Sequence, residues 1–142
     1  RIPVIDGFFH IIHRTNPGAA WSFLANVPWG IHVLAATSAV ASLLLAWMIF
    51  RYPDPRLRAC LSFILAGSLG NLVDRVLRGG VVDYLDFHFG SYIFPTFNLA
   101  DMMIVCGAIA LGALVLFRHD FLESALQSRP GSPGGGEGKA PG

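Results

Sequence analysis

Three apolar blocks, each long enough to cross a lipid bilayer, constrain this chain more than any other feature of its sequence. They cover residues 31–50, 57–73 and 99–117. At about 1.5 Å of rise per helical residue, about 20 residues span the roughly 30 Å hydrocarbon layer of a membrane. The second block carries Arg58 and Asn71 near its ends, and the third is polar only at Asp101. The pattern predicts an all-α membrane protein with three transmembrane helices and a small β element.

Composition argues against a nucleic-acid partner and against a metal site. The chain is 54% hydrophobic with a net charge of +1, whereas nucleic-acid binding needs a dense basic face. The histidines and cysteines do not have the spacing of a zinc site, so we expect no metal and no cofactor. His10 and His13 would approach a metal only if their strand bent, so they are interpreted as interfacial side chains, and His88 is interpreted as a single loop residue.

The basic residues predict the orientation of the helices. Arg51, Arg56 and Arg58 lie around the turn between the first two blocks, and Arg118 follows the third, which places both regions in the cytoplasm. Residues 1–30 then form an extracytoplasmic and interfacial segment, 31–118 a transmembrane catalytic domain with an outer loop at 74–98, and 119–142 a cytoplasmic tail. Because residues 1–30 need an upstream segment to cross the membrane, we expect a further transmembrane helix before this sequence.

The two terminal segments have different compositions. Residues 8–14 are rich in aromatic and β-branched side chains and predict a short strand, and Asn16-Pro17-Gly18 predicts a turn. Trp21 and Trp29 suit the aromatic belt of a membrane interface. Residues 128–142 are mostly Pro, Gly and Ser, which predicts that the tail is mostly disordered.

Two aspartates flank the outer loop. Asp83 follows Val81 and Val82, which predict a short strand, and Asp101 lies in the first turn of the third helix. A carboxylate at the end of a membrane helix is costly to desolvate and indicates a functional site. If the two carboxyl groups meet, they share one proton and can activate a water for attack on an amide carbonyl, as in aspartic proteases. Asp86 is an alternative to Asp83 in this role.

The neighbouring polar residues have two interpretations. Asn71 and Arg75 lie four residues apart on one helical face and offer an amide and a guanidinium to a substrate or a lipid headgroup. In the purely structural alternative, Asn71 packs against a neighbouring helix and Asp74 pairs with Arg78. Asn98 and Asp101 match an N-cap and a capping box, and the helix dipole favours an ionised Asp101.

Four motifs, in order, resemble the lipoprotein signal peptidase family, also called signal peptidase II. They are NPGAAWSF at 16–23, GNLVDR at 70–75, VVDY at 81–84 and FPTFNLAD at 94–101. Pro17 and Trp21 depart from the usual family pattern. The resemblance implies four transmembrane helices and an extracytoplasmic β-cradle, of which this chain would hold the last three helices and the cradle.

The resemblance also implies an activity and a site. Family members are bacterial inner-membrane aspartic endopeptidases that remove signal peptides from prolipoproteins, cutting before a cysteine that carries a diacylglyceryl group. The implied catalytic residues are Asp83 and Asp101, and the implied substrate-binding residues are Asn16, Asn71, Arg75 and Asn98. The expected partners are a lipidated prolipoprotein and membrane lipid, with a monomeric enzyme and its active site on the extracytoplasmic side.

Three other functions also place acids in membrane helices. A proton-coupled transporter usually carries them near the bilayer midplane, whereas both acids here map to one membrane surface. Presenilin-like diaspartyl proteases carry them deep inside helices. A non-enzymatic membrane subunit would use Asp101 only as a helix cap.

Overall fold

The computed structural model describes residues 1–18, 24–118 and 120–127. Predictions that concern Trp21 and the other residues of 19–23, or the tail at 128–142, lie outside the described residues. The elements, in chain order, are β1 (Ile2–Ile5), β2 (Phe9–Asn16), α1 (Gly30–Arg51), α2 (Pro55–Arg78), β3 (Val81–Phe89), β4 (Tyr92–Ile93), α3 (Leu99–Phe117) and α4 (Phe121–Gln127).

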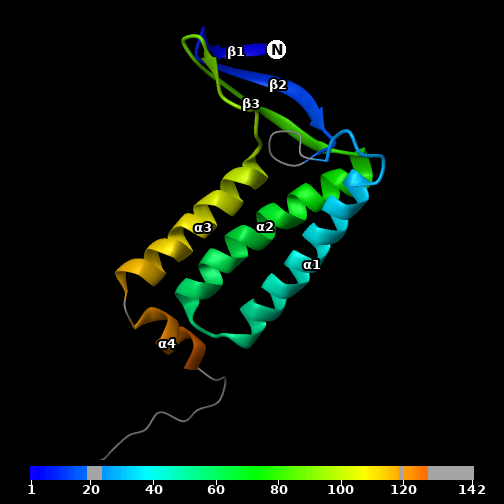
Figure 1. The fold of residues 1–142 in the computed structure, drawn as a ribbon. Coiled ribbons are helices and arrows are strands. Elements are labelled where there is room, and N and C mark those ends of the chain that lie inside the picture. Colours follow the sequence, from blue (N-terminus) through cyan, green and yellow to red (C-terminus); the bar gives the residue numbers. More distant parts are fainter. Residues whose placement is uncertain (19–23, 119, 128–142) are drawn as a thin grey trace, which may run out of the picture.

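The three long helices confirm the predicted membrane protein. Each of α1, α2 and α3 is long and apolar enough to cross a membrane. Their outward side chains are apolar yet exposed within the protein: Leu43 is 71%, Phe50 81% and Ile109 66% exposed. Lipid is the environment that covers such a surface, since water does not favour apolar patches of this extent. In Figure 1, α2 lies between α1 and α3, and it packs against both.

The turn between α1 and α2 contains Pro53 and Pro55. Asp54 is the N-cap of α2, and its carboxylate accepts hydrogen bonds from the backbone N–H groups of Arg56 and Leu57 at 2.9 and 3.0 Å. Pro55 follows as the first helical residue, where its missing N–H costs nothing. This tight turn makes α1 and α2 antiparallel neighbours.

Glycines allow α2 and α3 to approach closely. A Cβ atom at Gly67 would overlap the carbonyl oxygen of Ala100 and lie 2.8 Å from Cγ1 of Ile104. A Cβ at Gly107 would lie 2.9 Å from the carbonyl oxygen of Cys60. The backbones therefore touch at two levels, and Gly67 faces the residue that precedes Asp101.

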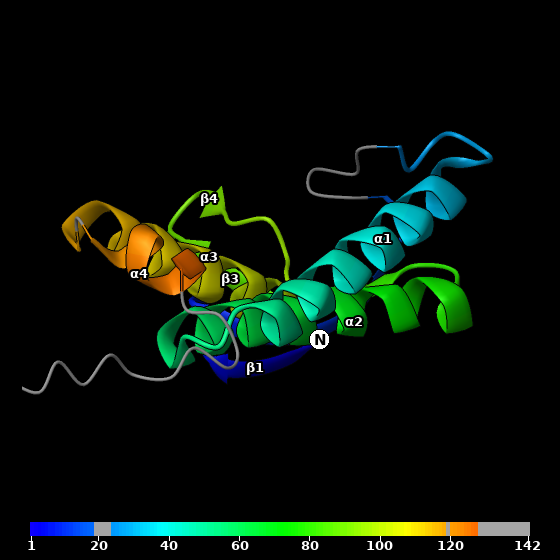
Figure 2. The same cartoon turned by 90° about the horizontal axis from the view of Figure 1, so that it is seen from below.

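A short helix that the sequence interpretation did not anticipate, α4, closes one end of the bundle. Phe121 and Ala125 lie four residues apart on one face and are 2% and 0% exposed. They pack with Leu57 and Leu61 of α2 in the buried apolar cluster of the protein. Figure 2 views the molecule from this end, with the strands behind the helices.

An antiparallel sheet lies at the opposite end of the bundle (Figure 1). Its strand order is β1-β2-β3-β4. The predicted strand at 8–14 is confirmed as β2, and the predicted strand at Val81-Val82 continues as β3 to Phe89. Much of the predicted loop at 74–98 is thus regular structure: α2 extends to Arg78, and His88 lies in a strand rather than in a loop.

Candidate active site

Asn98 joins the two predicted acids. Its side-chain oxygen accepts a hydrogen bond from the backbone N–H of Asp101 at 2.9 Å, and its Nδ2 donates to Oδ1 of Asp83 at 3.3 Å. The carboxylate of Asp101 in turn accepts from the backbone N–H of Asn98 at 3.2 Å. The predicted N-cap and capping box are therefore confirmed. The side-chain amide of Asn98, which caps α3, therefore also binds the carboxyl group of Asp83 on β3.

Asn71 adds a second link from α2. Its Nδ2 donates to Oδ1 of Asp101 at 2.9 Å, and its side-chain oxygen accepts from Nδ2 of Asn98 at 3.2 Å. Asn71 and Asn98 are 6% and 3% exposed, so each donor and acceptor needs these partners. Because Asn98 must present its oxygen to the backbone of Asp101, the orientation of both amides is determined by the network.

Two contacts of β3 bring Asp83 to this network. Leu85 and Phe97 exchange backbone hydrogen bonds at 2.9 and 3.2 Å, which places the segment before α3 alongside β3. At the other end, the carboxylate of Asp74 accepts from the backbone N–H of Val82 at 3.1 Å. Asp74 also forms the predicted ion pair with Arg78. The chain thus returns from the end of α2 along β3 to the start of α3.

Asp83 differs from an ordinary carboxyl group. It is 4% exposed, and burial, followed by the charge of Asp101, raises its pKa from 3.8 to about 6. Hydrogen bonds from Asn16 and Asn98 oppose this shift and do not cancel it. Asp101 is less buried, lies at the positive end of α3 and accepts two hydrogen bonds within the network. Burial thus favours the protonated form of the Asp83 carboxyl group.

Asn16 and Arg75 border the network. Nδ2 of Asn16 lies 3.5 Å from Oδ2 of Asp83. Nη1 of Arg75 donates to the hydroxyl of Ser38 on α1 at 3.3 Å and to the backbone oxygen of Asn71 at 3.4 Å. Its Nε is buried and has no hydrogen-bond partner among the described residues. The guanidinium thus links α2 to α1 and keeps a donor beside the site.

A cavity opens next to these residues. Its volume is about 430 Å³, and Asn71 and Asn98 contribute to its wall together with His13, Gly70, Asp74, Arg78, Val82, Tyr84 and Ala100. The sequence interpretation did not single out Tyr84, whose hydroxyl accepts from the backbone N–H of Leu99 at 3.1 Å. The sequence does carry a signal for Tyr84, because a tyrosine that packs against protein needs a hydrogen-bond partner for its hydroxyl group. The cavity is large enough for a few residues of an extended peptide.

Asp86 is not part of this arrangement. It lies three residues beyond Asp83 on β3 and therefore on the other face of the strand. Its carboxylate contacts His88 at 3.0 Å rather than Asp101. The structure thus brings together Asp83 and Asp101, and not Asp86.

Comparisons with known proteins identify relatives of this chain. A family model described as Signal peptidase (SPase) II matches residues 1–117. A lipoprotein signal peptidase of Syntrophus aciditrophicus (strain SB) is 44% identical over 114 residues, covering 78% of this chain and 71% of the relative. Another, of Francisella tularensis subsp. novicida (strain U112), is 40% identical over 117 residues, covering 80% and 73%.

The fold is also similar to a solved structure. A bacterial membrane enzyme determined by the in meso method superimposes with a TM-score of 0.68 at 27% sequence identity. The match covers 92% of this chain and 77% of that enzyme.

Proposed function

This chain belongs to the signal peptidase II family, and from that membership we propose that Asp83 and Asp101 are the catalytic pair with which it cuts its substrate. As a family member it is an aspartic endopeptidase that removes signal peptides from lipoprotein precursors. The transporter and the non-enzymatic subunit are not favoured by this membership.

One observation carries the choice of residues. Asn98 donates to Asp83 and accepts from the backbone of Asp101, so a single buried amide links both acids. Asn71 holds Asp101 from the opposite helix at 2.9 Å. A catalytic pair needs both groups fixed within hydrogen-bond reach of one reacting water, and such a network supplies that order before substrate arrives.

The two acids take different roles in the proposed reaction. Asp101, ionised, removes a proton from water while the water oxygen attacks the scissile carbonyl carbon, and Asp83 donates its proton to the carbonyl oxygen. A tetrahedral diol results. In the second half, Asp101 passes its proton to the leaving nitrogen as the C–N bond breaks, and Asp83 recovers a proton from the diol hydroxyl. Both acids return to their starting states.

The location of the pair supports a lipid-linked substrate. Both acids lie at the sheet end of the membrane helices, at the C-terminal end of α2 and the N-terminal end of α3. A precursor whose cysteine carries acyl chains holds them in the bilayer and presents the bond at this level. The Nε of Arg75, which has no partner within the described part of the chain, and the amide of Asn16 are the donors proposed to bind the substrate backbone.

The proposed orientation places the sheet outside the bacterial inner membrane. Arg51, Arg56 and Arg58 lie around the α1–α2 turn, and Arg118 ends α3 at the same end of the bundle. By the positive-inside rule a basic end of this kind faces the cytoplasm, and Arg75 and Arg78, in the last turn of α2, are the exceptions at the sheet end. The acids are then extracytoplasmic, where secreted precursors emerge.

Lipid dependence tests the substrate. The purified intact protein in lipid nanodiscs should cleave a precursor with a diacylglyceryl-cysteine at least about 100-fold faster than the same peptide with an unmodified cysteine, because the acyl chains supply positioning. Cleavage products identified by mass spectrometry should begin with the modified cysteine. Equal rates on both peptides would contradict lipid recognition while leaving the peptidase activity in place.

The pKa of Asp83 predicts the pH dependence. Since Asp83 must carry the proton, kcat/KM should fall about tenfold per pH unit above its pKa of about 6. The free energy of unfolding should also fall as pH rises, because ionising a buried acid with a raised pKa destabilises the fold. A rate that instead rises through this range would assign the base to Asp83. Rates over pH 4–9 on one lipidated peptide provide the measurement.

A further inference from the structure

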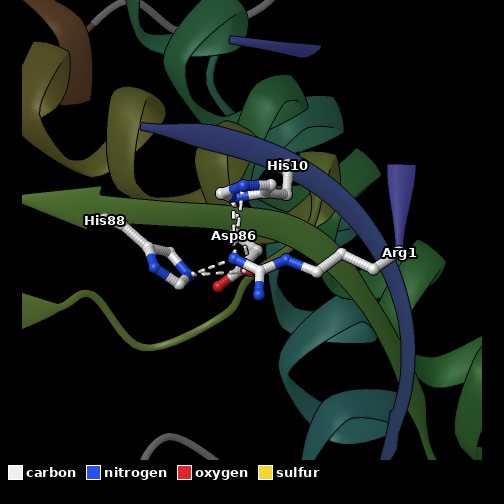
Figure 3. A network of polar contacts seen from close by, with 4 residues as sticks. All are labelled: Arg1, His10, Asp86 and His88. Carbon is white, nitrogen blue, oxygen red and sulfur yellow. Dashed lines mark hydrogen bonds and ion pairs between the residues drawn. The ribbon is translucent and has the colours of Figure 1, made fainter. Parts of the chain in front are cut away.

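A second polar cluster lies on the sheet, outside the proposed active site. His10 and Asp86 are directly opposed in the β2–β3 ladder. His88 is two residues beyond Asp86 and so projects from the same face of β3. Figure 3 shows the three side chains converging, with Arg1 among them. The sequence interpretation treated these histidines separately, because their contact arises only from strand pairing.

The spacing of the three side chains suits one metal ion. Oδ2 of Asp86 lies 3.0 Å from Nε2 of His88 and 3.8 Å from Nδ1 of His10. Ligands of a tetrahedral zinc ion, at about 2.0–2.1 Å each, are separated by about 3.3 Å, between these two values. One ligand atom from each residue lies within 4.8 Å of the others. Small side-chain rotations therefore complete the geometry.

The cluster is also largely enclosed. The side chains of His10, Asp86 and His88 are 7%, 8% and 17% exposed. Backbone pairing of β2 with β3 fixes the positions of the first two. A site whose ligands are held by a sheet loses little conformational entropy when it binds an ion.

Arg1 marks the point where the ion would sit. Its Nη2 lies 3.1 Å from Nδ1 of His10, 3.2 Å from Nε2 of His88 and 3.8 Å from Oδ2 of Asp86. A guanidinium has no acceptor, so ring nitrogens that bind it present lone pairs, as metal ligands do. The side chain of Arg1 is 53% exposed and can leave towards solvent.

We propose that His10, Asp86 and His88 bind a divalent transition-metal ion of the zinc class, and that Arg1 occupies the position in its place when the ion is absent. Two imidazoles and one carboxylate favour zinc over calcium or magnesium, which prefer oxygen ligands. Three protein ligands leave a fourth position for water. The ion would tie β2 to β3, the strand that carries Asp83. The proposal does not depend on the peptidase activity.

Calorimetric titration of the intact, detergent-solubilised protein with ZnCl2 tests the site. His10→Ala, Asp86→Asn and His88→Ala should each weaken binding by at least about 100-fold, the upper range for loss of even an outer partner. His32→Ala, at an exposed histidine of α1, is the matched control and should bind as the unaltered protein does. Arg1→Ala should tighten binding, because it removes a cation that competes for the same point.

Two results would overturn the proposal. One is zinc binding that all three ligand variants retain at the affinity of the His32→Ala control. The other is an Arg1→Ala variant that binds no more tightly than the unaltered protein. If a ligand variant does not fold, Co²⁺ added to the unaltered protein decides the matter: intense visible bands of a tetrahedral ion support the site, and the weak bands of an octahedral ion contradict it.

Discussion

Asp83→Asn and Asp101→Asn each lower kcat for a lipidated precursor by about 10³-fold, the middle of the range for a lost general acid or base. Asparagine keeps the shape of each side chain and one of its two acceptor oxygens, but it cannot exchange a proton at neutral pH. Asp101→Asn also leaves Asn98 in place as the N-cap of α3. The expected result is therefore a folded protein without turnover, measured as single-turnover cleavage of a labelled precursor in nanodiscs.

Asp6→Asn is the matched control for these two variants. Asp6 is an exposed acid of the same sheet, in the turn between β1 and β2, so its substitution should leave kcat within about twofold. Thermal unfolding separates catalysis from structure. If Asp101→Asn cleaves normally while its Tm falls, Asp101 is only a helix cap, and the proposed mechanism is wrong.

Gly67→Ala is expected to damage both stability and activity. The added methyl group would overlap the carbonyl oxygen of Ala100, so α3 must move away from α2 next to Asp101. Overpacking of this kind costs about 1–3 kcal/mol of unfolding free energy. The same movement separates Asn71 from Asp101, now 2.9 Å apart, and a displacement of about 1 Å can lower the rate about 100-fold.

Gly112→Ala provides the same chemical change where there is room for it. A Cβ at Gly112 would meet no atom within 4 Å, so this variant should be as stable as the unaltered protein or gain up to about 1 kcal/mol from better helix propensity. Denaturant unfolding and cleavage rates of both variants make the comparison. Equal behaviour of the two would show that close contact of α2 and α3 does not position Asp101.

The helices and the capping box of α3 could be predicted because both leave local signals. Apolar blocks of membrane length predicted the observed bounds of α3, Leu99–Phe117, and predicted both ends of α1 to within a few residues. The ends of α2 were less accurate, since Arg75 and Arg78 continue the helix beyond its apolar part. The capping box of Asn98 and Asp101 was visible as a spacing of three residues.

The contacts between distant segments could not be predicted from the sequence alone. That Asn98 binds Asp83, or that Asn71 binds Asp101, depends on how β3 meets α3 and how closely α2 approaches. The pairing of His10 with Asp86 depends on strand register, and β2 contains an irregularity that shifts this register between Ile11 and Arg14. Tertiary packing, rather than any local pattern, determines these positions.

The division of the acid pair between a strand and a helix has a consequence for biosynthesis. Asp83 belongs to the sheet and Asp101 to the membrane bundle, and Leu85 and Phe97 are the backbone connection between the two. In a newly inserted chain whose sheet has not yet docked, Asp101 is present in the bundle without Asp83 beside it. Assembly of the proposed catalytic pair therefore requires the sheet to dock on the helix bundle.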